Sequence, residues 1–407
     1  MNALPLSSTA APAPSGFISL VTVMSEMAAG REVESFLKQE QHGLDLAGLL
    51  MGMAVMSLLT GDGVTYASLQ ASALRRQQYY RLLRGPSAPA LRLLALMGPG
   101  DLSENTPLEF LLEGSDVELS LLYLAPDLPL PASLPEHDAY MVAIAPAEGS
   151  RWLLEAAAGL LRGTGKPVFN RPERIAPLLR DRASATLQGI AGLTVPRTAR
   201  VARALLDAIG AGRGGIADAL GEGDFPVIVR PLASHGGQGL AKISGRAELA
   251  DYLATRSEPE FFVAPFIDYA SADGQYRKYR IALIAGRPQL CHMAISSHWM
   301  VHYVNAGMAE SVAKRAEEAA VMLGFARDFA PRHGAIWQEM TARLGLDYAV
   351  MDCAELPDGS LLLFELDNVC IVHAMDSATL YPYKQTHMAG VFAAFRAMLD
   401  GPPLDAP

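Results

Sequence analysis

Oxygen-bearing side chains gather at the end of the last predicted hairpin of the chain. Asp352 ends one predicted strand and Glu365 ends its partner, with Asp367 and Asn368 directly beyond. On an antiparallel pair of strands, such side chains can converge on one face. Carboxylate and carboxamide oxygens suit a hard divalent cation, Mg²⁺ or Mn²⁺, which completes its shell with phosphate and water. The pattern predicts a metal site; a charged strand end that faces solvent is the structural alternative.

A glycine-rich loop follows a predicted strand that carries a cation near its end. The cation is Arg230, and the loop contains His235, Gly236, Gly237 and Gly239 before a second short strand begins. Strand, glycine turn and strand are typical of a hairpin rather than of a strand-to-helix nucleotide turn. A cation beside such a loop can hold phosphate oxygens while the loop N–H groups surround them. A plain turn is the alternative interpretation.

Two cations enter an apolar strand at alternate positions. Strand alternation places Lys278 and Arg280 on the same face, where they can face an anion, although a solvated edge would show the same pattern. A polar and aromatic cluster from His298 to Asn305, with His302 inside it, follows the next strand. A single histidine is more often structural than catalytic, so these histidines are candidates only.

The spacing of apolar residues divides the 407-residue chain into four parts. Residues 1–15, rich in Ala, Pro and Ser, predict a disordered tail, and residues 16–85 a helical N-terminal segment. Strands and helices alternate over 86–170, which predicts an open α/β domain with a parallel sheet. Residues 171–400 mix hairpins with helices, as an α+β domain does.

Individual elements follow from the same periodicities. Helices are predicted over 32–40, 46–59, 66–83, 106–112, 150–161, 182–190, 201–209, 310–344 and 386–399. Strands are predicted over 91–97, 118–124, 139–144, 225–231, 240–243, 261–267, 279–284, 289–296, 348–353 and 361–365.

Composition excludes several classes of function. The formal net charge of −10 argues against a nucleic-acid partner held through its phosphates. The apolar run 46–59 is shorter than the roughly 20 residues that cross a bilayer, so a buried helix is predicted there and no membrane association. The N-terminus lacks the basic region of a signal peptide, and three scattered cysteines form neither a disulfide framework nor a metal site. A cytoplasmic protein is expected. A helix as apolar as the one predicted over 46–59 must pack against another surface. A second subunit could provide it, which favours a homo-oligomer.

Taken in order, these pieces resemble the ATP-grasp enzymes, in particular the RimK-like carboxylate–amine ligases, over roughly residues 90–400. The family's "P-x-x-N-x-P-E" stretch corresponds to Pro167–Glu173, its Asp-Lys helix to Asp181-Arg182, and its "P-x-T" strand to Pro196–Thr198. The remaining motifs correspond, in chain order, to Arg230 with the glycine loop, Lys278-Tyr279-Arg280, Asn305-Ala306-Gly307, Asp352, and Glu365-Leu366-Asp367.

The resemblance implies an ATP-grasp fold: a pre-ATP-grasp open α/β domain, then a lid subdomain over 171–260 and a metal-binding, catalytic subdomain over 261–400. It implies that ATP lies between the two subdomains, with adenine against the backbone around Ala264 and Phe266. Phosphate contacts are implied for Arg182, Arg230 and the loop Gly236–Gly239, which would close over them. Lys278 is also expected to be one of the cofactor-binding residues. Mg²⁺ would bridge Asp352 and Glu365 to the phosphates, and Arg280, helped by Asn305, would neutralise the acyl-phosphate.

Several positions depart from the family pattern. Arg182 and Arg230 stand where lysines are usual, which keeps the charge and changes the reach. Asp367 replaces the usual metal-binding asparagine, unless Asn368 takes that role. The family's substrate loop after the metal site is replaced by a segment that contains His373. The substrate therefore does not follow from the resemblance.

The predicted activity is ATP- and Mg²⁺-dependent ligation of a carboxylate to an amine, by way of an acyl-phosphate, with an amino acid or peptide as the substrate class. His298, His302 or His373 is the candidate acceptor for the amine proton. Two alternatives stay open: a kinase-like phosphoryl transfer that ends at a phosphorylated product, and an inactive nucleotide-binding scaffold or regulatory protein.

Overall fold

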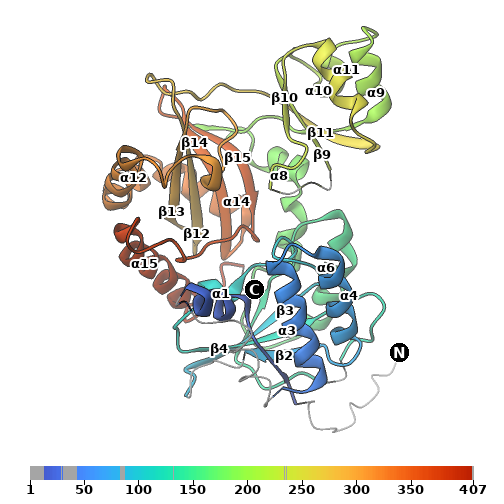
Figure 1. Ribbon diagram of the computed structural model, residues 1–407, viewed down its shortest axis with the longest axis vertical. Coiled ribbons are helices and arrows are strands. Elements are labelled where there is room, and N and C mark those ends of the chain that lie inside the picture. Colours follow the sequence, from blue (N-terminus) through green and yellow to red (C-terminus); the bar gives the residue numbers. More distant parts are fainter. Residues whose placement is uncertain are drawn as a thin grey trace.

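The computed structural model of the chain describes residues 13–28, 30, 44–82, 88–131, 133–232, 234 and 236–405. It contains three β-sheets with helices packed on and between them (Figure 1). Residues 1–12 of the predicted tail and the helix predicted over 32–40 lie outside the described residues.

The first sheet has six strands in the order β1-β2-β4-β3-β5-β6. They are β1 (Ser15–Phe17), β2 (Tyr79–Leu82), β3 (Leu91–Met97), β4 (Val117–Tyr123), β5 (Ala139–Val142) and β6 (Val168–Phe169). β3 pairs in parallel with β4 and β5, and β5 with β6, which confirms the parallel sheet predicted for this part. Along β3, Leu94 and Leu96 enter one core while Leu93 and Ala95 enter another, as expected for a strand covered on both faces.

The prediction of a purely helical segment over 16–85 is wrong at both of its ends. Helices α1 (Leu20–Ala28), α3 (Leu46–Leu59) and α4 (Gly63–Leu74) are present, but β1 and β2 flank them and join the first sheet. The last predicted helix ends at Leu74, because Tyr79 and Tyr80 pair with β4 and are buried. Tyrosine favours strands, and this pairing overrides helix propensity. The segment is therefore part of the α/β domain, and Ser15, assigned to the disordered tail, lies in β1.

Helix α3 confirms the apolar helix predicted over 46–59. It packs on α4 and β1 of the same chain, with Met51, Ala54 and Val55 buried. A Cβ on Gly48 would overlap the carbonyl oxygen of Gly16, so this close approach of helix to strand requires glycine. No described helix combines the length and the apolar character needed to cross a bilayer. The homo-oligomer stays a prediction.

The second sheet has four antiparallel strands in the order β10-β9-β11-β8 and lies at the upper right of Figure 1. Its elements are β8 (Ala199–Ala202), β9 (Val227–Pro231), β10 (Ala241–Ile243), β11 (Glu260–Pro265), α9 (Arg203–Gly210), α10 (Ile216–Leu220) and α11 (Arg246–Ala254). It has a core of its own. The glycine loop joins β9 to β10, as predicted, but the helix predicted over 201–209 begins only at Arg203, because Val201 belongs to β8 and pairs with Phe261.

The third sheet has five strands in the order β13-β12-β14-β15-β7. Its strands are β7 (Leu193–Thr194), β12 (Tyr276–Ile284), β13 (Arg287–Ser296), β14 (Tyr348–Glu355) and β15 (Leu361–Asp367). The long helical stretch predicted over 310–344 is helical, but Gly324, Pro331 and Gly334 divide it into α12 (Val312–Gly324), α13 (Phe329–Arg332) and α14 (Gly334–Leu344). The remaining helices are α5 (Leu108–Leu111), α6 (Arg151–Leu161), α7 (Pro172–Ile175), α8 (Arg180–Leu187) and α15 (Pro382–Met398).

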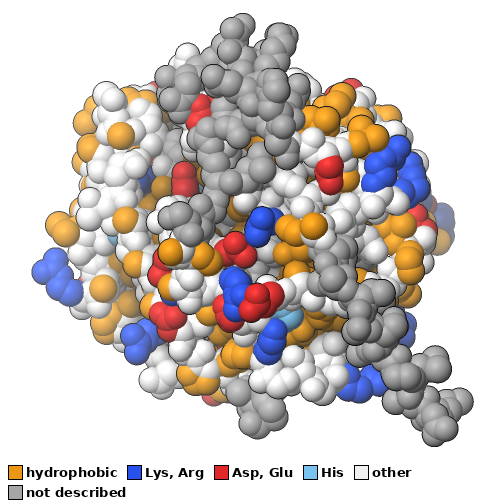
Figure 2. All heavy atoms as spheres, turned by 90° about the horizontal axis from the view of Figure 1, so that it is seen from below, with side chains coloured by type: hydrophobic (Ala, Val, Ile, Leu, Met, Phe, Trp, Pro, Cys, Tyr) orange, Lys and Arg blue, Asp and Glu red, His pale blue; other side chains and the backbone are white. Residues whose placement is uncertain are grey.

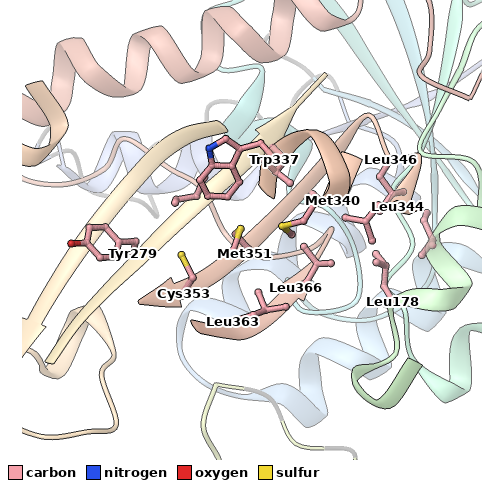
Figure 3. Close-up of a cluster of buried hydrophobic side chains, with 14 of the residues drawn as sticks. Leu178, Tyr279, Trp337, Met340, Leu344, Leu346, Met351, Cys353, Leu363 and Leu366 are labelled. Carbon is pink, nitrogen blue, oxygen red and sulfur yellow. The ribbon is translucent and has the colours of Figure 1, made fainter. Parts of the chain in front are cut away.

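The third sheet is covered on both faces, which fixes the direction of its polar side chains. Met351 and Cys353 of β14 pack with Trp337 and Met340 of α14 in the first core, together with Leu363 of β15 (Figure 3). The alternate residues Tyr348 and Val350 of β14 enter the second core, where α15 contributes. From Tyr348 to Met351 the residues of β14 alternate between the two cores, so Asp352, the next residue, shares the face of Val350.

Buried hydrogen bonds tie the first sheet to the third. Asn170 has a positive φ of 51° and exchanges two hydrogen bonds with the backbone of Tyr348, at 2.8 and 2.9 Å. Its own N–H donates to Asp347 at 2.7 Å. These bonds give the asparagine of the Pro167–Glu173 stretch a structural role: it fixes the start of β14 and so the direction in which Asp352 emerges.

The surface of the α/β domain mixes charge types. Figure 2, seen from below, shows Lys and Arg side chains interspersed with Asp and Glu and with hydrophobic side chains over the described part of that face. No block of a single sign stands out there.

Glu109 of α5 is a buried carboxyl group that provides a test of this domain. Burial raises its pKa to about 7, although Ser19 and the backbone N–H groups of Leu20 and Val21 hold the carboxylate. Because the folded pKa is raised, the folded state binds more protons, so stability falls as pH rises from about 4 to 7. Glu109→Gln should be close to neutral at pH 5 and stabilising by about 2–3 kcal/mol at pH 8. Urea unfolding at both values checks this. The exposed Glu113→Gln is the control and should shift stability by less than about 0.5 kcal/mol; an equal shift in both variants would contradict the prediction.

Candidate active site

A cavity of about 640 Å³ lies between the second and third sheets and reaches the first. Residues of β9, β11, β12, β14, β15 and α8 line it, together with the glycine loop and the segment Trp299–His302. Four cationic and four acidic side chains are among the lining residues: Arg180, Arg230, Lys278, Arg280, Asp101, Asp352, Glu365 and Asp367.

Asp352 lies at the centre of the charged end, bonded to two cations of the neighbouring strand. Lys278 Nζ donates to its Oδ2 at 2.9 Å, and Arg280 donates from Nε to Oδ1 at 2.8 Å and from Nη2 to Oδ2 at 3.0 Å. Lys278 and Arg280 thus share a face and meet an anion, as predicted, but that anion is Asp352. Burial opposes ionisation of Asp352, yet Arg280 and Lys278 outweigh it and hold its pKa well below the ordinary range.

Glu365 and Asp367 occupy alternate positions of β15 on the same side of the cavity. Glu365 accepts from Arg180, and the guanidinium outweighs burial, so the pKa of Glu365 is lowered. Burial and the charge of Glu365 raise the pKa of Asp367 to about 7. Two carboxylates held this close repel each other, an arrangement that a cation between them relieves.

Arg180 takes the place predicted for Arg182. Arg180, Ala183 and Ser184 follow the i, i+3, i+4 spacing of one helical face of α8 and line the cavity. Arg182 points the other way and is exposed. Arg182 therefore does not line this cavity, and Arg180, two residues earlier on α8, does.

Arg230 lies at the base of the glycine loop and is held from behind. Its Nε donates to Ser234 Oγ at 3.2 Å and its Nη2 to the Ser234 carbonyl oxygen. Burial and the nearby Arg180 lower its pKa to about 10, so it stays cationic at neutral pH. Gly236 and Gly237 line the cavity; Gly239 does not, and its carbonyl oxygen accepts from Tyr252. His235 lies outside the described residues.

The segment Trp299–His302 faces the glycine loop across the cavity. Burial and the charge of Lys278 lower the pKa of His302, so its ring is neutral at pH 7. Asn305 is exposed and does not line the cavity; its side-chain oxygen accepts from the His302 N–H at 3.0 Å. The direct catalytic role predicted for Asn305 is therefore not supported by its position.

Gly237 allows this loop and segment to meet. A Cβ at Gly237 would lie 2.5 Å from His302 Nε2, whereas a Cβ at Gly236 meets nothing within 4 Å, and both residues have positive φ. Gly237→Ala should therefore weaken binding of an ATP analogue about tenfold more than Gly236→Ala, which carries the backbone strain alone. Calorimetry on both variants tests this. Adding His302→Ala should remove the difference; a difference that persists would show that His302 is not its cause.

Ala264 and Phe266 line the cavity at its apolar end, as predicted. The Phe266 N–H donates to the Pro226 carbonyl at 3.0 Å, so this donor is already used. Its ring lies under Lys242, 3.7 Å from the ammonium to the ring centroid, and edge-on to Trp299 at 5.7 Å between centroids. The aromatic pair joins the second sheet to the segment Trp299–His302.

Three further candidate site residues, Asn368, His373 and His298, lie outside the cavity lining. Asn368 is buried and donates to Thr106 Oγ1 at 3.2 Å and to the Ile144 carbonyl at 3.1 Å, so it joins β15 to the first sheet and is not placed as a metal ligand. His373 packs near Phe110, and its Nδ1 accepts from the Met375 N–H at 3.2 Å. His298 is exposed.

The described residues contain no group of three or more His, Cys, Asp or Glu side chains placed to hold a metal ion. Glu365 and Asp367 form a pair instead. Mg²⁺ is bound in many proteins by one or two carboxylates and completes its shell with phosphate oxygens and water, so this pair fits such an ion when a nucleotide is bound.

The cavity continues to the carboxyl end of β3, which the sequence did not indicate. Asp101, Leu102 and Ser103 of the loop after β3 and Leu58 of α3 line this part. A smaller cavity of about 80 Å³ adjoins it and shares Leu58, Asp101 and Leu102. Because β4 and β5 lie on opposite sides of β3, this edge is the switch point at which open α/β sheets bind ligands.

No protein-family model matches the chain. Among solved structures, it is similar to a RimK domain ATP-grasp protein from Sphaerobacter thermophilus DSM 20745, with 21% identity, a TM-score of 0.42, and coverage of 75% of this chain and 98% of that one. The VanG D-Ala:D-Ser ligase from Enterococcus faecalis has 12% identity, a TM-score of 0.46, and coverage of 78% and 100%. The D-alanine–D-alanine ligase from Coxiella burnetii has 12% identity, a TM-score of 0.47, and coverage of 77% and 95%. In the described residues of this chain, an open α/β domain precedes two mainly antiparallel sheets, which is the arrangement expected from the sequence.

Proposed function

We propose that the chain is an ATP- and Mg²⁺-dependent ligase that activates a carboxylate as an acyl-phosphate and joins it to an amine. One observation carries the proposal: a single cavity has three sections. One end is apolar and lies against β11, the centre is cationic and lies beside two carboxylates, and the other end lies at the switch point of the α/β sheet. Nucleotide, transferred phosphoryl group and acceptor each have a matching section.

Adenine would lie against β11. Phe266 directs its N–H toward Pro226, so by alternation Pro265 and Ile267 direct their backbone groups to the other side. Both line the cavity. The Pro265 carbonyl can accept from the adenine amino group, and the Ile267 N–H can donate to a ring nitrogen. Recognition thus moves one residue away from the predicted Ala264 and Phe266.

The phosphates would lie among Arg180, Arg230 and the glycine loop. Phosphoryl transfer needs little covalent help from a protein beyond positioning and countercharge. Glu365 and Asp367 would hold Mg²⁺, which supplies charge neutralisation at the phosphates. Arg280, within reach of this centre, would stabilise negative charge on the transferred group.

The chemistry takes two steps. A carboxylate oxygen of the substrate attacks the γ-phosphorus, the bond to the bridging oxygen of ADP breaks, and an acyl-phosphate forms. The amine nitrogen then attacks the acyl carbon, inorganic phosphate leaves, and the amine gives up a proton. His302, neutral at pH 7 and in the cavity wall, is the best-placed histidine to accept that proton.

The carboxylate and the amine would meet at the carboxyl end of β3. Apolar Leu58 and Leu102 and the single acid Asp101 line this end. An amino acid or a peptide fits such a mixture, with its reacting carboxylate toward Arg280 and a positively charged amine toward Asp101.

The experiment is a screen for ADP and phosphate release from MgATP against pooled amino acids and dipeptides, with mass spectrometry of the products. Amine-dependent ADP release that gives a condensed mass, lost in Glu365→Gln, supports the ligase. A phosphorylated product without condensation would favour the kinase-like alternative. Nucleotide binding without turnover across the pool would favour the scaffold, and no nucleotide binding would reject the assignment.

A further inference from the structure

The two oxygens of Asp352 are both occupied by cations of its own sheet. Three hydrogen bonds of 2.8 to 3.0 Å from Lys278 and Arg280 reach them. The side chain of Asp352 is only 4% exposed, and those of Lys278 and Arg280 are 11% and 20% exposed. The three side chains form a closed cluster in the cavity floor.

Glu365 and Asp367 differ from Asp352 in this respect. The Glu365 side chain is 33% exposed. Its Oε1 accepts from Arg180, and Asp367 Oδ1 accepts from the Val369 N–H at 3.1 Å. Among the described residues, Glu365 is paired with one cation, Arg180, and Asp367 forms no ion pair. Asp352, in contrast, is bonded to two cations.

We propose that one divalent ion binds per chain, at Glu365 and Asp367, and that Asp352 is a positioning residue for Lys278 and Arg280. Under this assignment, Asp352 binds the Lys278 ammonium instead of a metal ion. That ammonium then faces the phosphates as a fixed cation. The inference rests on the proposed function, since it concerns the same nucleotide site.

Competition between cations supports this assignment. A divalent ion at Asp352 would have to displace a lysine or an arginine from a buried carboxylate, and the displaced cation would lose the carboxylate to which it is bonded. Two cations 3 Å from the same carboxylate would also repel an incoming ion. Lysine is a compact point charge with three donors, so Lys278 can keep its bond to Asp352 and donate to a phosphate oxygen as well.

The test is the number of Mn²⁺ ions bound per chain in the presence of the non-hydrolysable analogue AMP-PNP, measured by electron paramagnetic resonance. One bound ion is expected for the wild type. Two bound ions would overturn the inference and leave the ligase intact, whereas failure to bind AMP-PNP would overturn both.

Two matched substitutions assign the ligands. Asp367→Asn should weaken Mn²⁺ binding at least tenfold, and Asp352→Asn should change it less than threefold. If Asp352→Asn does not fold, the double variant Lys278→Met/Asp352→Asn, which removes a cation together with the carboxylate, replaces it. Because Lys278 faces the phosphates, this double variant and Asp367→Asn are then compared for binding of Mn²⁺ alone, without nucleotide, with the same expected changes. Asp352 would be shown to be a ligand if the Asp352 variant that folds lost as much Mn²⁺ affinity as Asp367→Asn.

Discussion

Replacing Arg280 by methionine is expected to slow ADP formation by about 10²–10³-fold while the affinity for AMP-PNP changes by less than about fivefold. The bidentate bond to Asp352 and a third bond, from Nη1 to the Ile371 carbonyl at 3.1 Å, hold the guanidinium in one orientation. A donor fixed in this way needs no reorganisation when charge develops on the transferred group, so its loss falls on the chemical step. In the proposed site, Arg230 and Arg180 would still contact the nucleotide in this variant.

The control is Arg280→Lys, which keeps the charge and gives up the fork geometry. It should lie between the wild type and Arg280→Met, because an ammonium cannot reach Asp352 and the Ile371 carbonyl in the same directions. Single-turnover ADP release and calorimetry separate the two quantities. Wild-type ADP release in Arg280→Met, or a loss confined to AMP-PNP affinity, would show that Arg280 does not face the transferred group.

Elements with a strong period could be predicted from the sequence, and elements that depend on a distant partner could not. The strand β3 and the helix α3 have the predicted bounds because an unbroken apolar run has few alternatives. The strands β1 and β2 are three and four residues long, and pairing with each other and with β4 makes them strands. No local pattern in 15–17 or 79–82 carries that information.

The candidate site divides in the same way. Lys278, Arg280, Asp352 and Glu365 could be found because alternation along a strand fixes which residues share a face. Their pairing with one another could not be found, since it needs the register Arg280↔Asp352↔Glu365 across three strands.

The remaining site residues were missed or misassigned for different reasons. Arg180 was missed although the helical face of Ala183 and Ser184 pointed to it. Asn368 was predicted as a ligand because it follows Asp367, yet its side chain crosses to Thr106, 262 positions away in sequence. The loop after β3 has no distinctive composition, so its part in the cavity follows only from the fold.

Asp352→Asn is expected to destabilise the chain by about 3–5 kcal/mol, because it leaves Lys278 and Arg280 buried without their anion. The folded pKa of Asp352 is lowered, so its stabilising effect is present above the pKa of the unfolded chain and is lost only as pH falls through the lower folded value. The deficit should therefore be the same at pH 5 and pH 8. Thermal or urea unfolding of the chain, followed by tryptophan fluorescence, measures this deficit.

Asp367→Asn is the matched control, because the same substitution at another aspartate of the cavity is expected to change stability in the opposite direction. The pKa of Asp367 is raised to about 7 by burial and by Glu365, so the folded state disfavours its charge. Stability contributed by protonation is present at pH 5 and is lost as pH rises through 7, so this variant should be neutral at pH 5 and stabilising at pH 8.

The two aspartates therefore differ in what surrounds them and not in chemistry. A deficit in Asp352→Asn that shrinks when Lys278→Met is added would measure the coupling between carboxylate and ammonium, which in contacting buried pairs is about 0.5–3 kcal/mol. If instead Asp352→Asn lost no stability at pH 8, the closed cluster around Asp352 would not exist in solution. Lys278 would then be free to move, and Asp352 would return as a candidate metal ligand.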